Sequence, residues 1–105
     1  MSAADVDVSY DFVDYEAITV SSTPVGLTAT KIQPAGGRKR RGAVIHIATN
    51  ACRYRLDPEA HHLSTTTGIV VAAGDEFTVD GHNNLSQLRL IASATDGAAQ
   101  VHYYE

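Results

Sequence analysis

The sequence has no tryptophan and a single cysteine, Cys52. One thiol cannot form an internal disulfide, and it excludes zinc or iron–sulfur sites that need several cysteines. The lack of a tryptophan and of a cysteine pair also argues against an immunoglobulin-type sandwich, because that core is built on both. With 105 residues, the chain has the length of one domain.

Long apolar runs are missing too. No segment approaches the roughly 18 apolar residues of a membrane-spanning helix, so we expect no membrane partner. The first sixteen residues carry five acidic side chains and no basic one, which is the opposite of the basic start of a signal peptide. We therefore expect synthesis in the cytoplasm.

Helical spacing of apolar residues is nearly absent, whereas short runs of alternating apolar and polar residues are frequent. Turn-forming residues separate these runs at intervals typical of antiparallel sandwiches and barrels. We predict an all-β chain that forms a single antiparallel β-sandwich, jelly-roll or Greek-key like, with about eight or nine short strands. The main expected strands are residues 17–21, 27–33, 43–49, 51–56, 68–73, 76–80, 85–92 and 99–105.

The N-terminal residues differ from the remainder. Apolar side chains alternate there with acidic and hydroxyl side chains, which is the pattern of an extended segment with one apolar face. We predict an acidic arm over residues 1–14 and a β-sandwich domain over residues 15–105. The apolar stripe needs a surface to cover it, so its members are candidate partner-binding residues. They are Val6, Val8, Tyr10 and Phe12.

Alternation within the expected strands also assigns a core. The residues expected inside are Ile45, Ile47, Cys52, Tyr54, Leu56, Ile69, Val71, Phe77, Val79, Leu88, Leu90, Val101 and Tyr103. Those expected to face solvent or a partner are Arg53, Arg55, Thr78, Gln87, Arg89, His102 and Tyr104.

Four of the eight basic residues are contiguous, at Arg38, Lys39, Arg40 and Arg41, between two glycines. Such a loop is a solvated turn, a contact with a protein or a contact with nucleic acid. The net charge of −4 and the absence of neighbouring aromatic residues make nucleic acid unlikely. An acidic arm on one copy could meet this basic loop on another, which predicts a homo-oligomer held partly by charge.

Catalytic patterns are absent. The five histidines include no His-x-His pair of the kind that metal-binding barrels use. Cys52 has the strand parity of Tyr54, which favours a core role over a reactive thiol. No nucleophile elbow and no phosphate-binding glycine loop occurs. We expect no catalytic residue, no metal and no cofactor, and hence a protein that is not an enzyme.

Several short stretches resemble a family of small phage-encoded proteins from virion structural genes, which are single-domain β-sandwiches. They are residues 15–23, 25–28, 53–57, 67–68, 73–76 and 101–105. The resemblance implies a capsid decoration protein, or a neck or tail subunit, which is made in the host cytoplasm and located in the virion. Its partners would be other copies of itself and capsid or tail lattice proteins. The acidic arm and the basic loop are longer and more charged than this family leads us to expect.

Two other functions stay open. Jelly-roll sandwiches often bind sugars on a polar aromatic face, and Tyr104, His102 and Arg89 would supply such a face here. The five histidines leave room for a small metal-dependent β-barrel enzyme.

Overall fold

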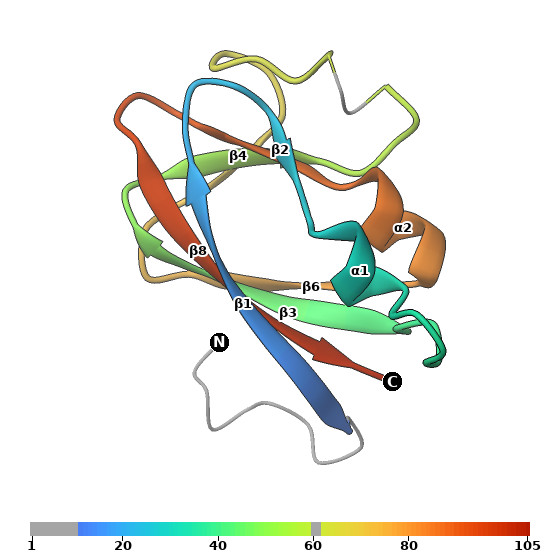
Figure 1. Ribbon diagram of the computed structural model, residues 1–105. Helices are drawn as coiled ribbons and strands as arrows, with labels where there is room; N and C mark the ends of the chain where they lie inside the picture. Colours follow the sequence, from blue (N-terminus) through green and yellow to red (C-terminus); the bar gives the residue numbers. More distant parts are fainter. Residues whose placement is uncertain (1–10, 60–61) are drawn as a thin grey trace.

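The computed structural model describes residues 11–59 and 62–105. These residues form two four-stranded antiparallel sheets that pack face to face (Figure 1). In spatial order, the larger sheet consists of β1 (Phe12–Val20), β8 (Gly97–Tyr104), β3 (Gly42–Thr49) and β6 (Glu76–Asp80). The smaller sheet consists of β2 (Val25–Gly26), β7 (Arg89–Ala92), β4 (Cys52–Arg55) and β5 (Ile69–Val71). The predicted all-β sandwich is confirmed.

The strands pair in a nested order. β1 pairs with β8, β2 with β7, β3 with β6 and β4 with β5, all antiparallel. The ladders between β3 and β8 and between β4 and β7 complete the two sheets. This order is that of a long hairpin rolled into two layers, which is the winding of an eight-stranded jelly roll.

Two short helices replace parts of the expected strands: α1 (Ala29–Ile32) and α2 (His82–Gln87). The prediction of strand over residues 27–33, and over the first residues of 85–92, is therefore wrong. Leu85 and Leu88 are both fully buried. Their three-residue spacing places them on the same side of a helical turn. Within the described residues, neither helix has the length or the apolar character to cross a bilayer.

The core lies between the two sheets and contains most of the residues that alternation assigned to it. Tyr54, Leu56 and Phe77 are half-buried and pack against it. Ile69 was expected inside but is 59% exposed, because it begins the short edge strand β5, which has a neighbour on one side only. Tyr104 was expected to face outward but is fully buried, because Phe12 and Arg41 lie against its ring.

The link between β4 and β5 packs against the small sheet. Leu63 in this link is buried, and the Arg53 guanidinium donates to the carbonyls of Thr65 and Gly68 at 2.9 and 3.2 Å. Thr65 and Gly68 are thereby held against β4.

β1 runs without a break through the expected boundary between residues 14 and 15. Its register against β8 shifts between Phe12 and Asp14, so the strand holds one irregularity near its start. The arm predicted over residues 1–14 falls mostly outside the described residues and stays a prediction.

Candidate functional site

The structure separates the basic loop into two halves. The side chains of Arg38 and Arg40 have exposed fractions of 84% and 13%. Lys39 is exposed. Arg41 is also 57% exposed, but its guanidinium lies beside the Tyr104 ring. Arg38 and Lys39 therefore extend furthest into solvent, although Arg38 Nη1 also lies 3.8 Å from Oε1 of Glu105. Arg40 and Arg41 make the closer contacts with the folded domain.

Arg40 anchors the loop to the end of the chain. Its Nη1 donates to Oε2 of Glu105 at 3.0 Å, and its backbone N–H donates to the carbonyl of Ile32 at 2.9 Å. The Glu105 backbone N–H in turn donates to the carbonyl of Asp11. The basic loop, the C-terminus and the start of β1 are thus tied together.

Arg41, Tyr104 and Asp80 form a row of contacting side chains on the outer face of the large sheet. Gly42 lies opposite both Tyr104 and Asp80 in the strand register. The Tyr104 hydroxyl donates to Oδ1 of Asp80 at 2.7 Å, and Arg41 Nε lies 3.3 Å from the same oxygen. The Arg41 guanidinium is 5.5 Å from the centre of the Tyr104 ring.

Phe12 packs over His102 and Tyr104 on the same outer face. Its ring is stacked on His102 with centroids 4.2 Å apart, and it meets Tyr104 edge-on at 6.0 Å. Tyr104 is therefore on the outward parity that alternation predicted, but Phe12 and Arg41 exclude solvent from it. Val6, Val8 and Tyr10, the other three predicted partner-binding apolar residues, lie outside the described residues.

A second tyrosine is held on the inner side. The Tyr103 hydroxyl donates to Glu16, whose other oxygen accepts from Thr28 Oγ1 at 2.6 Å. Burial, and then the hydrogen bond to this carboxylate, raise the pKa of Tyr103. Nearby, the backbone N–H of Tyr15 and then Lys31 lower the pKa of Asp14. These contacts join β1 to α1 and β8.

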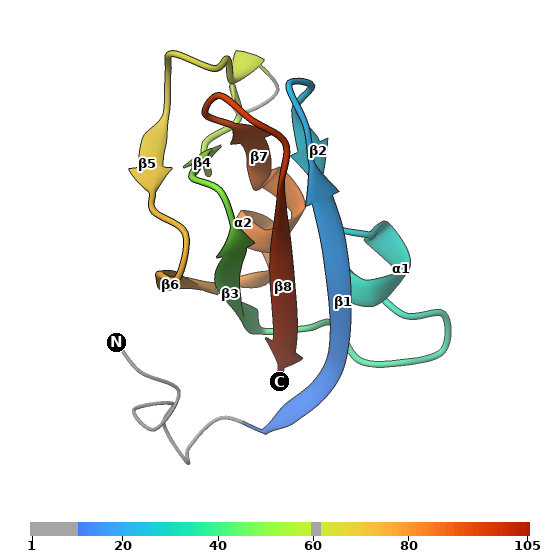
Figure 2. The same cartoon turned by 90° about the vertical axis from the view of Figure 1, so that its left-hand side faces the viewer.

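The exposed large apolar side chains of the described residues lie on two edge strands. Val13 and Tyr15 are on β1, and Ile69 and Val70 are on β5. Figure 2 shows these two strands on opposite sides of the sandwich. The molecule therefore has an apolar edge on each side.

Beside β5 is an open, mainly apolar pocket of about 400 Å³. It is lined by Tyr54, Arg55, Leu56, Asp57, Gly68 and Ile69. The Tyr54 ring stacks on Phe77 at 4.2 Å, and Arg55 Nε lies 2.8 Å from Asp57 Oδ1. The hydrogen bond from Arg55 lowers the pKa of Asp57. Aromatic surface thus extends the apolar edge of β5.

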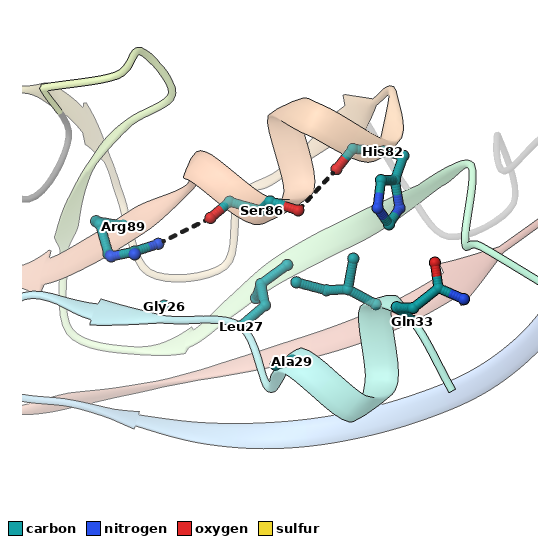
Figure 3. A pocket seen from close by; sticks show the side chains of 8 residues that line it. Gly26, Leu27, Ala29, Gln33, His82, Ser86 and Arg89 are labelled. Carbon is teal, nitrogen blue, oxygen red and sulfur yellow. Dashed lines mark hydrogen bonds between the residues drawn. The ribbon is translucent and has the colours of Figure 1, made fainter. Parts of the chain in front are cut away.

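A second pocket, of about 450 Å³, opens between α1 and α2 (Figure 3). Its lining residues are Gly26, Leu27, Ala29, Ile32, Gln33, His82, Ser86 and Arg89. Sequence reasoning did not find this pocket, because it assigned strand to both flanking segments. The signal was the four-residue spacing of His82 and Ser86, which places both on one side of a helical turn. Arg89 follows at the start of β7.

The residues considered for chemistry are dispersed. Cys52 is fully buried, and burial raises the pKa of its thiol. Among residues 11–59 and 62–105, no three metal-ligating side chains lie together. The proposed sugar-binding face is not assembled either, because Arg89 is in the small sheet and His102 and Tyr104 are in the large one.

No protein-family model, curated protein or solved structure matches this chain. Its function must be inferred from the sequence and the geometry alone.

Proposed function

We propose that this protein is a structural subunit of a phage particle, which oligomerises and binds the particle lattice as a capsid decoration or stabilisation protein. The observation that carries the proposal is the presence of exposed large apolar side chains on two edge strands, β1 and β5.

Edge strands of soluble monomers are normally protected, since unpaired backbone groups beside apolar side chains favour association. Here Val13 and Tyr15 are exposed on β1, and Ile69 and Val70 are exposed on β5. Because the two edges face opposite ways (Figure 2), contact between unlike edges would join copies head to tail. Such contacts produce rings when the rotation closes, which suits a repeated particle component.

The basic loop supplies the second kind of contact. Arg38 and Lys39 are exposed, while Arg40 and Glu105 fix the base of the loop. An exposed pair of cations on a fixed base suits recognition of an acidic protein surface, because complementary charge steers and orients association.

The jelly-roll winding supports the proposal more weakly. Viral capsid domains share this architecture, but so do lectin domains and cupins, and a fold alone does not assign a function. The proposal is therefore supported mainly by the apolar edges of β1 and β5 and by the basic loop. A neck or tail position is the alternative within the same proposal.

The first experiment is mass spectrometry of purified particles of the source phage. The proposal predicts this polypeptide at a stoichiometry comparable with a lattice protein, and its absence from the particles would refute the proposal. Immunogold labelling of intact particles separates the two positions, since a decoration protein labels the capsid and the alternative labels the neck or tail.

The second experiment tests the edges. Tyr15→Glu and Val70→Glu place a charge on the two apolar edges, and we expect each to lower the oligomeric mass in sedimentation and to reduce binding to particles. Thr78→Glu is the control, because Thr78 is exposed on β6 and its side chain points to the opposite face of that strand from Phe77. A wild-type protein that is monomeric and does not bind particles would contradict the proposal.

A further inference from the structure

We propose that the pocket between α1 and α2 is a binding site for a small organic carboxylate. Its volume of about 450 Å³ is within the range of small-molecule sites. This inference stands apart from the proposed function, because no residue of β1, β5 or the basic loop lines the pocket.

The charge of the lining selects the ligand. Arg89 is a permanent cation, and none of the eight lining residues is acidic. A guanidinium in a partly enclosed pocket favours an anion, and its planar fork matches the two oxygens of a carboxylate. The lining therefore favours an anionic ligand over a neutral or cationic one.

The Arg89 guanidinium is held in place before any ligand arrives. Its Nη1 donates to the carbonyls of Ser86 and Leu88 at 3.1 and 2.8 Å. Gly26 leaves room for it, since a Cβ atom at Gly26 would lie 2.8 Å from Nη1. The structure shows no partner for Nε or Nη2 in residues 11–59 and 62–105. Fixed donors of this kind bind a ligand without losing side-chain freedom.

His82 supplies a second donor. Its ring points from α2 toward the space between the helices (Figure 3). The Nδ1 atom is buried and has no hydrogen-bond partner among the described residues. A buried N–H without an acceptor is unfavourable, which favours the tautomer with its proton on Nε2. His82 then presents an N–H to an oxygen of the ligand.

Apolar side chains form part of the remaining wall, together with Gln33 and Ser86. Leu27 and Ile32 are buried members of the core cluster that also line the pocket. No Tyr or Phe lines it, which removes the aromatic surface that commonly packs against a sugar ring. The best fit is a carboxylate attached to a compact apolar body.

The probe is phenylacetate, with phenylacetamide as its uncharged counterpart, titrated into the ¹⁵N-labelled protein and followed by NMR. We expect saturable shifts at amides around Gly26, Gln33 and Arg89, and affinity at least tenfold weaker for the amide. The absence of shifts, equal affinity for the two compounds or shifts confined to another region would each overturn the proposal.

Two variants test the lining. Arg89→Gln should weaken phenylacetate binding at least tenfold, while Lys39→Gln removes the same charge outside the pocket and should leave binding unchanged. Ala29→Leu tests the site without disturbing the bonds of Arg89, because it fills space at the exposed start of α1 and should reduce affinity. Equal loss with Lys39→Gln and Arg89→Gln, or unchanged binding in Ala29→Leu, would refute the assignment.

Discussion

Arg38 and Lys39 differ from Arg40 and Arg41 although all four are consecutive and carry the same charge. The first pair lies at the surface of a loop. In the second pair, Arg40 is largely covered and paired with Glu105, and Arg41 is packed over Tyr104 beside Asp80. A contiguous run of charge in the sequence is thus two different features in the fold: a solvent-exposed pair, for which we propose a role in recognition, and a pair that contacts the folded domain.

The difference arises from partners that are distant in the sequence. Glu105 is the last residue, and Asp80 ends β6. Both reach the loop because β8 and β6 flank β3, which begins where the loop ends. Function and stability should therefore be separable within four residues.

Disrupting the packing around Gly42, where the basic loop joins β3, should lower the stability of the protein most. In Gly42→Val, the new Cβ would clash with the Tyr104 hydroxyl and approach the Val79 carbonyl to 2.5 Å. We expect a loss of about 2 to 4 kcal/mol in unfolding free energy, measured by urea denaturation. Gly36→Ala is the control: its Cβ would meet nothing within 4 Å, so only the positive φ matters. A variant as stable as this control would show that the packing around Gly42 is loose.

Removing the Tyr103 hydroxyl should lower the unfolding free energy by a smaller amount. Tyr103→Phe deletes the hydrogen bond to Glu16, for which we expect about 1 to 2 kcal/mol at neutral pH. The folded pKa of Tyr103 is raised above its usual value of 10.0. The stability from the neutral hydroxyl is therefore complete below pH 10 and lost as the pH rises further.

Chemical denaturation between pH 8 and 11 measures this loss. We expect Tyr103→Phe to weaken the alkaline decline, whereas Arg38→Gln/Lys39→Gln should leave it unchanged. An identical decline in wild type and Tyr103→Phe would assign the alkaline sensitivity to another group.

Arg40→Gln should have a smaller effect, since its ion pair with Glu105 is partly exposed. We expect a loss of about 1 kcal/mol, between the values for surface and fully buried pairs. Arg40→Lys keeps the charge but loses the guanidinium geometry, so it should recover part of the loss. Thermal unfolding of the three proteins measures this order, and no loss in Arg40→Gln would mean that Glu105 does not anchor the loop.

The double variant Arg38→Gln/Lys39→Gln should change stability least, by less than about 0.5 kcal/mol. Its effect should be on binding: co-sedimentation of wild type with particles should weaken with salt, and that of the variant should be weaker and less salt-dependent. A gel shift with random DNA is the parallel assay, and tight DNA binding by wild type would replace the protein partner with nucleic acid.

Much of the fold was predictable because alternation is a local signal. Glu76–Asp80 was predicted with its observed bounds, and residues 43–49 differ from β3 by one residue. The helices were missed because each is shorter than two turns, too short for helical spacing to stand out from strand spacing. Leu88 fits both patterns, because it alternates with Leu90 as in a strand and lies three residues from Leu85 as in a helix.

The candidate sites were less predictable because they depend on contacts between distant segments. Alternation placed Tyr104 on the outer face, but its burial depends on Phe12 and Arg41. Similarly, the pocket combines Gly26 and Gln33 with Arg89, which no local pattern relates.

The nested strand pairing also has consequences for the kinetics of folding. Only the β4–β5 ladder joins consecutive strands, and the ladder of β1 with β8 joins the two ends of the described chain. Each outer ladder must close a longer loop than the one inside it, at a cost in entropy that grows with loop length. We therefore expect slow folding, in milliseconds to seconds, that proceeds outward from β4–β5 and leaves the β1 edge unpaired until the last step.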